Sequence, residues 1–259
     1  MQRVLPDGVA DRIATAGRVV VFTGAGISAE SGVPTFRDAL TGLWSRFDAY
    51  ELATPEAFEA DPALVWGWYE WRRAAVRKAE PNAGHVAAAA LQALVPGTVV
   101  VTQNVDDLHE RAGSKDPVHL HGSLFAPRCV AGHPFDAPSG DDDVPDDLGP
   151  VPPPRCTACG ALVRPGVVWF GEALPRAAFT AAVEAASSCD VLLSIGTSGV
   201  VYPAAELPVV ATRSGATVIQ VNPDETPLDD ICDVNLRGTA ARLLPALYAE
   251  VKEVTAGGR

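Results

Sequence analysis

The stretch that decides the fold is Arg18-Val19-Val20-Val21-Phe22, followed at once by Thr23-Gly24-Ala25-Gly26-Ile27-Ser28. A short run of β-branched apolar residues that ends in a glycine-rich turn is typical of a buried parallel strand and the loop after it. Glycines in this loop let the backbone approach a pyrophosphate, and a following helix directs its N–H groups at the same charge. A turn with a purely structural role is the alternative, because one glycine-rich turn is weak support by itself.

The spacing of the glycines disfavours a hydride-transferring dehydrogenase. Gly24 and Gly26 fit the fingerprint of those enzymes, but the third glycine comes late, at Gly32. In addition, no strand with an acidic ribose ligand follows about twenty residues further on, as those enzymes require.

Three further segments have the pattern of buried strands, at residues 98–102, 191–195 and 216–221. Helical patterns lie between them, at residues 85–94 and 176–187. Strands and helices in alternation predict an α/β fold, with a Rossmann-like parallel sheet covered by helices on both faces. In such a sheet, ligands bind at the carboxyl ends of the strands.

Composition narrows the class of protein. The chain has 259 residues and a formal net charge of −12. This charge disfavours a nucleic-acid partner, because neutralising phosphates needs clustered Lys and Arg. No apolar run reaches transmembrane length, and the first residues lack the apolar core of a signal peptide. We therefore expect a cytoplasmic protein with no membrane partner.

The middle of the chain departs from the alternation of strands and helices. Residues 130–154 contain an acidic run at 141–147 and four prolines between 150 and 154. Charge and proline disfavour packed structure, so we expect a solvated loop. This loop separates Cys129 from Cys156 and is expected to belong to a small inserted module.

Six motifs, in order along the chain, resemble those of the sirtuins, a family of NAD-dependent protein deacylases. They lie at residues 24–37, 102–109, 119–124, 168–172, 196–198 and 221–223, and the first has Val33 where the family usually has isoleucine. The resemblance implies a single sirtuin domain over residues 1–259. Its Rossmann-like core is expected to take in about residues 8–35, 85–121 and 168–250. A smaller helical and zinc-ribbon-like module is expected to be inserted at about residues 36–84 and 122–167.

The resemblance also implies a catalytic group. His121 is expected to be the base that activates a ribose hydroxyl, a task that suits histidine because its ordinary pKa lies near neutrality. Asn104 and Asp106 are expected to line the nicotinamide and ribose pocket beside it. For the other histidines, at positions 85, 109 and 119, we expect structural roles.

Two sets of binding residues follow from the same resemblance. The acyl-lysine peptide is expected to contact Val168, Phe170 and Gly171, in a segment (168–172) that resembles the strand that pairs with the substrate peptide. The residues expected to contact the co-substrate NAD are Gly24, Ala25, Gly26, Ile27, Ser28, Phe36, Arg37, Trp44, Gln103, Asn104, Val105, Asp106, Gly196, Thr197, Ser198, Asn222, Pro223, Asp224 and Ala240.

A metal site is expected as well. A Cys-x-x-Cys pair, Cys156 and Cys159, suggests metal rather than a disulfide in a cytosolic protein. Sirtuins usually carry a second such pair, but here Cys129 is followed by Gly132 where its partner would stand, and His133 comes next. A Cys₃His site holds zinc in the ordinary tetrahedral way. The alternative is a degenerate module without metal.

Tyr69 and Arg72 bear on the substrate. They stand three residues apart, so on a helix they share one face, where a phenol and a guanidinium can bind a carboxylate. By position alone, a packing helix with its polar groups turned to solvent is the simpler interpretation. The pair, however, resembles the Tyr-x-x-Arg signature of class III sirtuins, which remove succinyl, malonyl and glutaryl groups from lysine.

The function expected from the resemblance is NAD-dependent removal of succinyl-type and malonyl-type groups from protein lysine, with acetyl groups removed too. The products are nicotinamide, free lysine and O-acyl-ADP-ribose. The alternatives are an ADP-ribosyltransferase or a plain deacetylase on the same scaffold, and a non-catalytic NAD-binding module.

Overall fold

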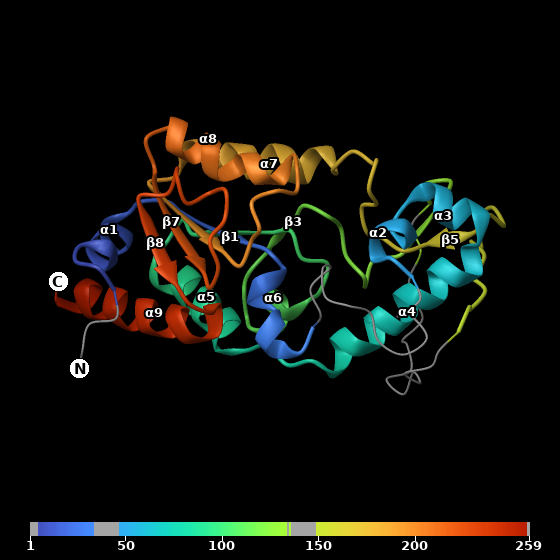
Figure 1. The fold of residues 1–259 in the computed structure, drawn as a ribbon, viewed down its shortest axis with the longest axis horizontal. Coiled ribbons are helices and arrows are strands. Elements are labelled where there is room, and N and C mark those ends of the chain that lie inside the picture. Colours follow the sequence, from blue (N-terminus) through green and yellow to red (C-terminus); the bar gives the residue numbers. More distant parts are fainter. Residues whose placement is uncertain (1–4, 34–46, 134, 136–148, 258–259) are drawn as a thin grey trace.

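The computed structural model describes residues 5–33, 47–133, 135 and 149–257. Within them, six parallel strands form one sheet in the order β3-β2-β1-β6-β7-β8 (Figure 1). The strands are β1 (Val19–Thr23), β2 (Val99–Thr102), β3 (Val118–His119), β6 (Val191–Ile195), β7 (Thr217–Asn222) and β8 (Val234–Arg237).

Helices cover both faces of the sheet. Successive side chains of a strand point to opposite faces, so Val19 and Val21 pack in one core and Val20 and Phe22 in another. The first core takes in α1 (Val9–Thr15), α5 (Ala83–Leu94) and α9 (Ala240–Gly257), and the second α7 (Arg176–Ser188) and α8 (Leu207–Arg213). Figure 1 shows α7 and α8 above the sheet and α5 and α9 below it. The predicted Rossmann-like sheet is therefore confirmed.

Short elements complete the sheet domain. The loop after β1 contains two turns of 3₁₀ helix, η1 (Ala25–Ile27) and η2 (Ala29–Ser31). The short helix α6 (Leu108–Arg111) follows β2, and η4 (Ala204–Glu206) precedes α8. α5 begins two residues before its predicted start, because the Asn82 side chain accepts a hydrogen bond from Gly84 N and His85 Nδ1 pairs with Asn82 N.

A smaller module lies beside the sheet, at the right of Figure 1. It holds α2 (Ala49–Leu52), α3 (Pro55–Ala60), α4 (Pro62–Lys78) and a two-stranded antiparallel sheet of β4 (Arg128–Cys129) and β5 (Val163–Arg164). The side chain of Asp61 caps α4 by accepting a hydrogen bond from Leu64 N. Trp68 and Tyr69 on this helix are buried against Leu124 and Trp169. No helix in the described part of the chain is long and apolar enough to cross a bilayer.

Two expected segments can be compared with the structure. The described parts of residues 130–154 contain no helix or strand, in keeping with the predicted loop. Residues 168–172, expected to resemble a strand, form no strand: Glu172 N donates to Trp169 O at 3.1 Å, and Gly171 has a φ of 85°. The segment thus turns at Gly171 where a strand was expected, because a left-handed glycine interrupts an extended chain.

Candidate active site

A cavity of about 770 Å³ opens at the carboxyl ends of the strands. The loops after β1, β2, β6 and β7 line one side of it, and α4 and residues 167–172 line another. This is where ligands bind in open α/β sheets, and the volume is in the range of small-molecule sites.

The loops after β1 and β6 meet backbone to backbone. Gly24 N donates to Ile195 O and Gly26 N to Gly196 O, both at 2.9 Å. A Cβ on Gly26 would lie 2.7 Å from Gly196 Cα, closer than real Cβ atoms come, and Gly196 has a φ of 58°. These glycines therefore allow two loops to pack together at the cavity edge, in addition to any role toward a phosphate.

His121 faces the cavity with one ring nitrogen held by the backbone. Its Nδ1 lies 2.9 Å from the carbonyl oxygen of Gln103. A carbonyl only accepts, so Nδ1 carries the hydrogen and Nε2 is the basic nitrogen. Burial lowers the pKa of His121, and the bond to Gln103 O opposes this shift without cancelling it. The ring is therefore neutral at neutral pH and able to accept a proton.

Asn104 and Asp106 meet at the hydroxyl of Ser28. Ser28 Oγ donates to Asp106 Oδ2 at 3.0 Å and accepts from Asn104 Nδ2 at 3.1 Å. Asp106 Oδ1 accepts from Leu108 N at 3.1 Å. Burial raises the pKa of Asp106, against the effect of these two hydrogen bonds. The three side chains form a fixed polar floor to the cavity.

The other histidines lie behind this floor or to its side. His85 and His109 are buried, and burial lowers their pKa values to about 3 and about 4. His85 Nε2 lies 3.3 Å from Ser28 Oγ, and His109 Nε2 lies 2.9 Å from Thr23 Oγ1. His119 pairs with Glu110 at 2.7 Å. The contacts agree with the structural roles expected for all three.

Tyr69 and Arg72 line the same cavity as His121 and Asn104. Both stand on α4, and Arg72 Cζ lies 5.0 Å from the ring centre of Trp68 and 5.8 Å from that of Tyr69. The Tyr69 hydroxyl accepts a hydrogen bond from Trp169 Nε1 at 3.0 Å, and burial raises the pKa of Tyr69 to about 12. A protonated phenol and a guanidinium thus stand together on the cavity wall.

Most of the predicted binding residues line this one cavity. They are Gly24, Ala25, Gly26, Ser28, Gln103, Asn104, Val105, Asp106, Val168, Phe170, Gly171, Gly196, Thr197, Ser198, Asn222, Pro223 and Asp224. Ile27 and Ala240 do not line it, because both pack into the core between the sheet and α5 and α9. The predicted residues Phe36, Arg37 and Trp44 lie outside the described residues.

Several cavity residues were missed by the sequence reasoning. Trp68 and Trp71 line the cavity on α4, and Tyr50 stacks against Phe170 with ring centres 5.0 Å apart. Because Tyr69 and Arg72 were singled out in the same tryptophan-rich run, their neighbours could have been found by helical spacing. Tyr202, an exposed residue of the wall, has no comparable signal in the sequence.

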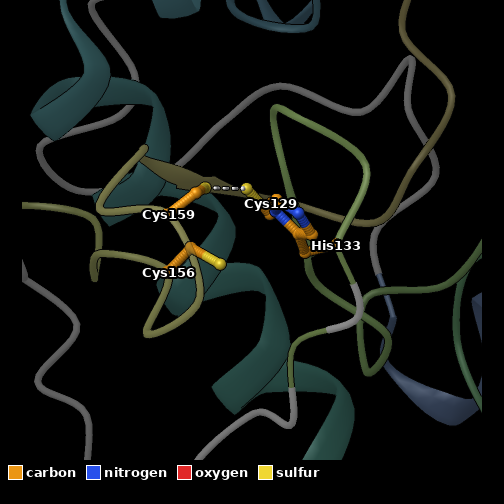
Figure 2. A group of neighbouring side chains, drawn as sticks. All are labelled: Cys129, His133, Cys156 and Cys159. Carbon is orange, nitrogen blue, oxygen red and sulfur yellow. Dashed lines mark hydrogen bonds between the residues drawn. The ribbon is translucent and has the colours of Figure 1, made fainter.

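Figure 2 shows the candidate metal site, with the side chains of Cys129, His133, Cys156 and Cys159 turned toward one another. Their ligand atoms all lie within 4.8 Å of one another, and the Sγ atoms of Cys129 and Cys159 are 3.5 Å apart. Ligands of a tetrahedral zinc stand about 3.8 Å apart for thiolates. Three sulfurs and one imidazole therefore fit zinc in donor type and spacing.

Gly132 explains how histidine can replace the missing cysteine. Its φ is 86°, and its N–H donates to Cys129 O at 2.9 Å. Cys129 N in turn donates to His133 O at 3.2 Å. The left-handed glycine thus makes a tight turn that carries His133 back to the cysteines.

Comparisons with known proteins, by sequence and by structure, find relatives of one family. Residues 24–203 match the Sir2 family. An NAD-dependent protein deacylase of Methylococcus capsulatus is 60% identical over 238 residues, which are 92% of this chain and 93% of that protein. The crystal structure of a Sir2 homolog in complex with NAD has a TM-score of 0.88 at 45% identity, over 97% of this chain and 95% of that one. The structure of Sir2Af2 bound to a myristoylated histone peptide has a TM-score of 0.77 at 36% identity, over 96% and 97%.

Proposed function

This chain belongs to the Sir2 family and is an NAD-dependent protein deacylase, and we propose that the acyl groups it removes from lysine include the acidic ones, succinyl and malonyl, with acetyl as a further substrate. One observation carries the proposal: Tyr69 and Arg72 line the cavity that also holds His121 and Asn104. We call Tyr69 and Arg72 the acyl clamp.

The acyl clamp suits an acidic acyl chain for a physical reason. A succinyl group carries its own carboxylate, and burying that charge without a partner would cost several kcal/mol. The surrounding wall is largely aromatic, with Trp68, Trp71 and Trp169 beside the clamp. Arg72 keeps its charge even though burial lowers its pKa, because a guanidinium stays protonated in proteins. It therefore offers the fixed cation that such a carboxylate needs.

The remaining cavity residues fit NAD as co-substrate. Two loops, at Gly24–Gly26 and Gly196–Ser198, bring backbone groups to the cavity edge without side chains between them. Thr197, in the second loop, is hydrogen-bonded to residues of two other strands or loops at the cavity edge. Its Oγ1 accepts from Gln103 Nε2 and its carbonyl oxygen accepts from Asn222 Nδ2, each at 2.9 Å. Pre-formed polar edges of this kind hold a dinucleotide without reordering.

We assign the chemical roles accordingly. NAD supplies the ribosyl carbon that accepts the acyl amide oxygen when nicotinamide leaves. His121 Nε2 takes a proton from a ribose hydroxyl, so that the hydroxyl oxygen can attack the acyl carbon. The bond from the acyl carbon to the lysine nitrogen then breaks, the nitrogen takes up a proton and leaves as the free amine, and one water adds to the acyl carbon. Asn104 and Asp106, held by Ser28, orient the ribose and the nicotinamide end. The products are nicotinamide, free lysine and O-acyl-ADP-ribose.

The substrate is proposed to be a polypeptide. The neighbour solved with a myristoylated histone peptide binds an acylated polypeptide, and here residues 168–171 line the cavity beside the acyl clamp. We place the reaction in the cytoplasm, where thiols stay reduced, in accord with five free cysteines in the structure.

The test is Arg72→Met, assayed with NAD and matched succinyl-lysine and acetyl-lysine peptides. Removing the only charge of the clamp is expected to lower kcat/KM for the succinyl peptide by about 100-fold, because a charge-assisted hydrogen bond to a buried carboxylate is lost. Deacetylation should change little. Arg77→Met is the matched control, because Arg77 stands on the same helix, over the ring of Phe125, and outside the cavity lining.

Mass spectrometry of the products separates the alternatives. Formation of O-succinyl-ADP-ribose supports the proposal, while ADP-ribose attached to protein would identify a transferase instead. If Arg72→Met lowers both deacylations equally, Arg72 has a structural role and the acidic preference is refuted.

A further inference from the structure

Trp169 connects the acyl clamp to Arg164 of β5, in the smaller module that also carries the metal-ligand cluster. Its indole Nε1 donates to the Tyr69 hydroxyl at 3.0 Å, across 100 positions of sequence. Both side chains are buried, with 3% of Trp169 and 2% of Tyr69 exposed. A buried indole N–H needs an acceptor, and here that acceptor is a residue of the clamp.

This hydrogen bond determines how the Tyr69 hydroxyl can be used. An indole N–H is only a donor, so the phenol oxygen is the acceptor. Burial raises the pKa of Tyr69 to about 12, so the hydroxyl keeps its hydrogen at neutral pH. The structure shows no other hydrogen bond of this hydroxyl within the described residues. Its hydrogen is therefore available to an acceptor in the cavity, next to the Arg72 guanidinium.

The indole itself is held firmly. Arg164 Cζ lies 3.4 Å from the ring centre of Trp169, and the ring of Phe58 lies 5.4 Å away from it. Glu172 Oε2 accepts from Trp169 N at 2.8 Å, and the same carboxylate binds Arg164 through both oxygens, at 2.5 and 2.9 Å. A two-pronged ion pair with 8% of Arg164 exposed is a rigid support.

We propose that Trp169 is a positioning residue for acidic acyl groups: its N–H occupies the Tyr69 hydroxyl oxygen, which leaves the hydroxyl hydrogen to bind the acyl carboxylate beside Arg72. The inference rests on the proposed function, since it concerns the same clamp. Trp169 acts through Tyr69 and needs no contact with the carboxylate itself. An acetyl group has no carboxylate, so its removal does not depend on this orientation.

The test is Trp169→Phe, which keeps a buried aromatic ring and removes the N–H donor together with one ring of the indole; the loss of ring volume is matched by the control variant below. For a succinyl-lysine peptide, KM is expected to rise about 5- to 10-fold, the range for loss of one neutral hydrogen bond, with kcat little changed. Because Trp169 also lines the cavity, the readout is the ratio of the two KM values: the KM for the acetyl-lysine peptide should rise less than the KM for the succinyl-lysine peptide, and measurable deacetylation also shows that the variant folds. Trp66→Phe is the matched control, because Trp66 is equally buried but lies outside the cavity lining.

A double-mutant cycle makes the test specific. In a Tyr69→Phe background there is no hydroxyl to orient, so adding Trp169→Phe should cause no further rise in KM for the succinyl peptide. An equal loss for both peptides, or an undiminished effect in the Tyr69→Phe background, would overturn the positioning role.

The outcome is also separable from that of the proposed function. If Arg72→Met lowers desuccinylation as expected while Trp169→Phe leaves the succinyl KM unchanged, only the role of Trp169 fails. If Arg72→Met leaves desuccinylation intact, the acidic preference itself fails.

Discussion

At the scale of single residues, the site depends on which groups are neutral. His121 must be neutral to accept a proton, and burial lowers its pKa. His119, whose Nδ1 lies 3.1 Å from Asn104 O, has its pKa raised: burial is the largest single effect and lowers the pKa, but the hydrogen bond and charge of Glu110, the bond to Asn104 O and the charge of Asp106 together outweigh it. The two histidines therefore titrate on opposite sides of the ordinary value of about 6.5.

This difference predicts the pH profile. Because the proposed base, His121, cannot accept a proton once it is protonated, kcat/KM should fall only as the pH drops through the lowered pKa, with a midpoint below about pH 6.5 and a flat region above it. The measurement is kcat/KM for an acetyl-lysine peptide from pH 5 to 8. His119→Gln should keep the same limb. A midpoint above about 6.5 that disappears in His119→Gln would assign the limb to His119 instead.

The sequence predicted which residues lie near the cavity better than it predicted what each of those residues contacts. Gly26 was interpreted as a close approach to a phosphate, and the structure adds a close approach to Gly196 that no pattern in the chain indicates. Ile27 was grouped with the cofactor residues by resemblance, but an apolar side chain next to a strand packs into the core.

At the scale of elements, the two-stranded sheet of β4 and β5, in the smaller module that also carries the metal-ligand cluster, is very short. β4 and β5 have two residues each, and isolated two-stranded hairpins are at best marginally stable in water. Cys129 on β4 pairs with Val163 on β5, and Arg164, the support of Trp169, is the next residue. A metal at the four ligands would therefore fix the β4–β5 sheet and, through Arg164, the segment that follows it.

Metal removal tests this dependence. We expect about one zinc per chain, and treatment with a strong chelator should lower the melting temperature by about 6 °C, the shift for a loss of about 2 kcal/mol in a chain of this size. His133→Ala should bind zinc more weakly, whereas Cys232→Ala, outside the cluster, should keep the parent zinc content. Less than about half an equivalent of zinc after gentle purification, or an unchanged melting temperature, would count against the site.

The strands that were predicted correctly from the sequence are the buried ones. The four strands predicted from apolar runs lie within one residue of β1, β2, β6 and β7, because strands covered on both faces leave continuous apolar sequence. The edge strands β3 and β8 were not predicted. β8 reads Val-Asn-Leu-Arg with its polar residues exposed, and β3 has only two residues, too few for any period.

At the scale of the whole molecule, two buried histidines join the helical layer to the end of β1 and the loop after it. His85, in the first turn of α5, contacts Ser28, and His109, in α6, contacts Thr23. Their rings lie 5.2 Å apart in an edge-to-face arrangement. Thr23 Oγ1 also donates to Thr102 Oγ1 at 2.8 Å, so the ends of β1 and β2 belong to the same network. The floor of the cavity and the packing of the fold thus depend on the same neutral groups.

Acid should therefore destabilise the protein well before its carboxylates titrate. Burial lowers the pKa of His109 to about 4, while the unfolded chain has an ordinary histidine. Below about pH 6.5 the unfolded state binds more protons than the folded state. The free energy of unfolding therefore decreases as the pH is lowered, by about 2 kcal/mol for this histidine at pH 5.

The check is urea unfolding at pH 7.5 and pH 5 for the parent and for His109→Gln, which has no titrating group but can still bond to Thr23. Because both proteins share the net charge of −12 that acid reduces, that general effect cancels in the comparison. The variant should lose less stability on acidification, and equal losses in the two proteins would show that His109 is not the group through which acid acts.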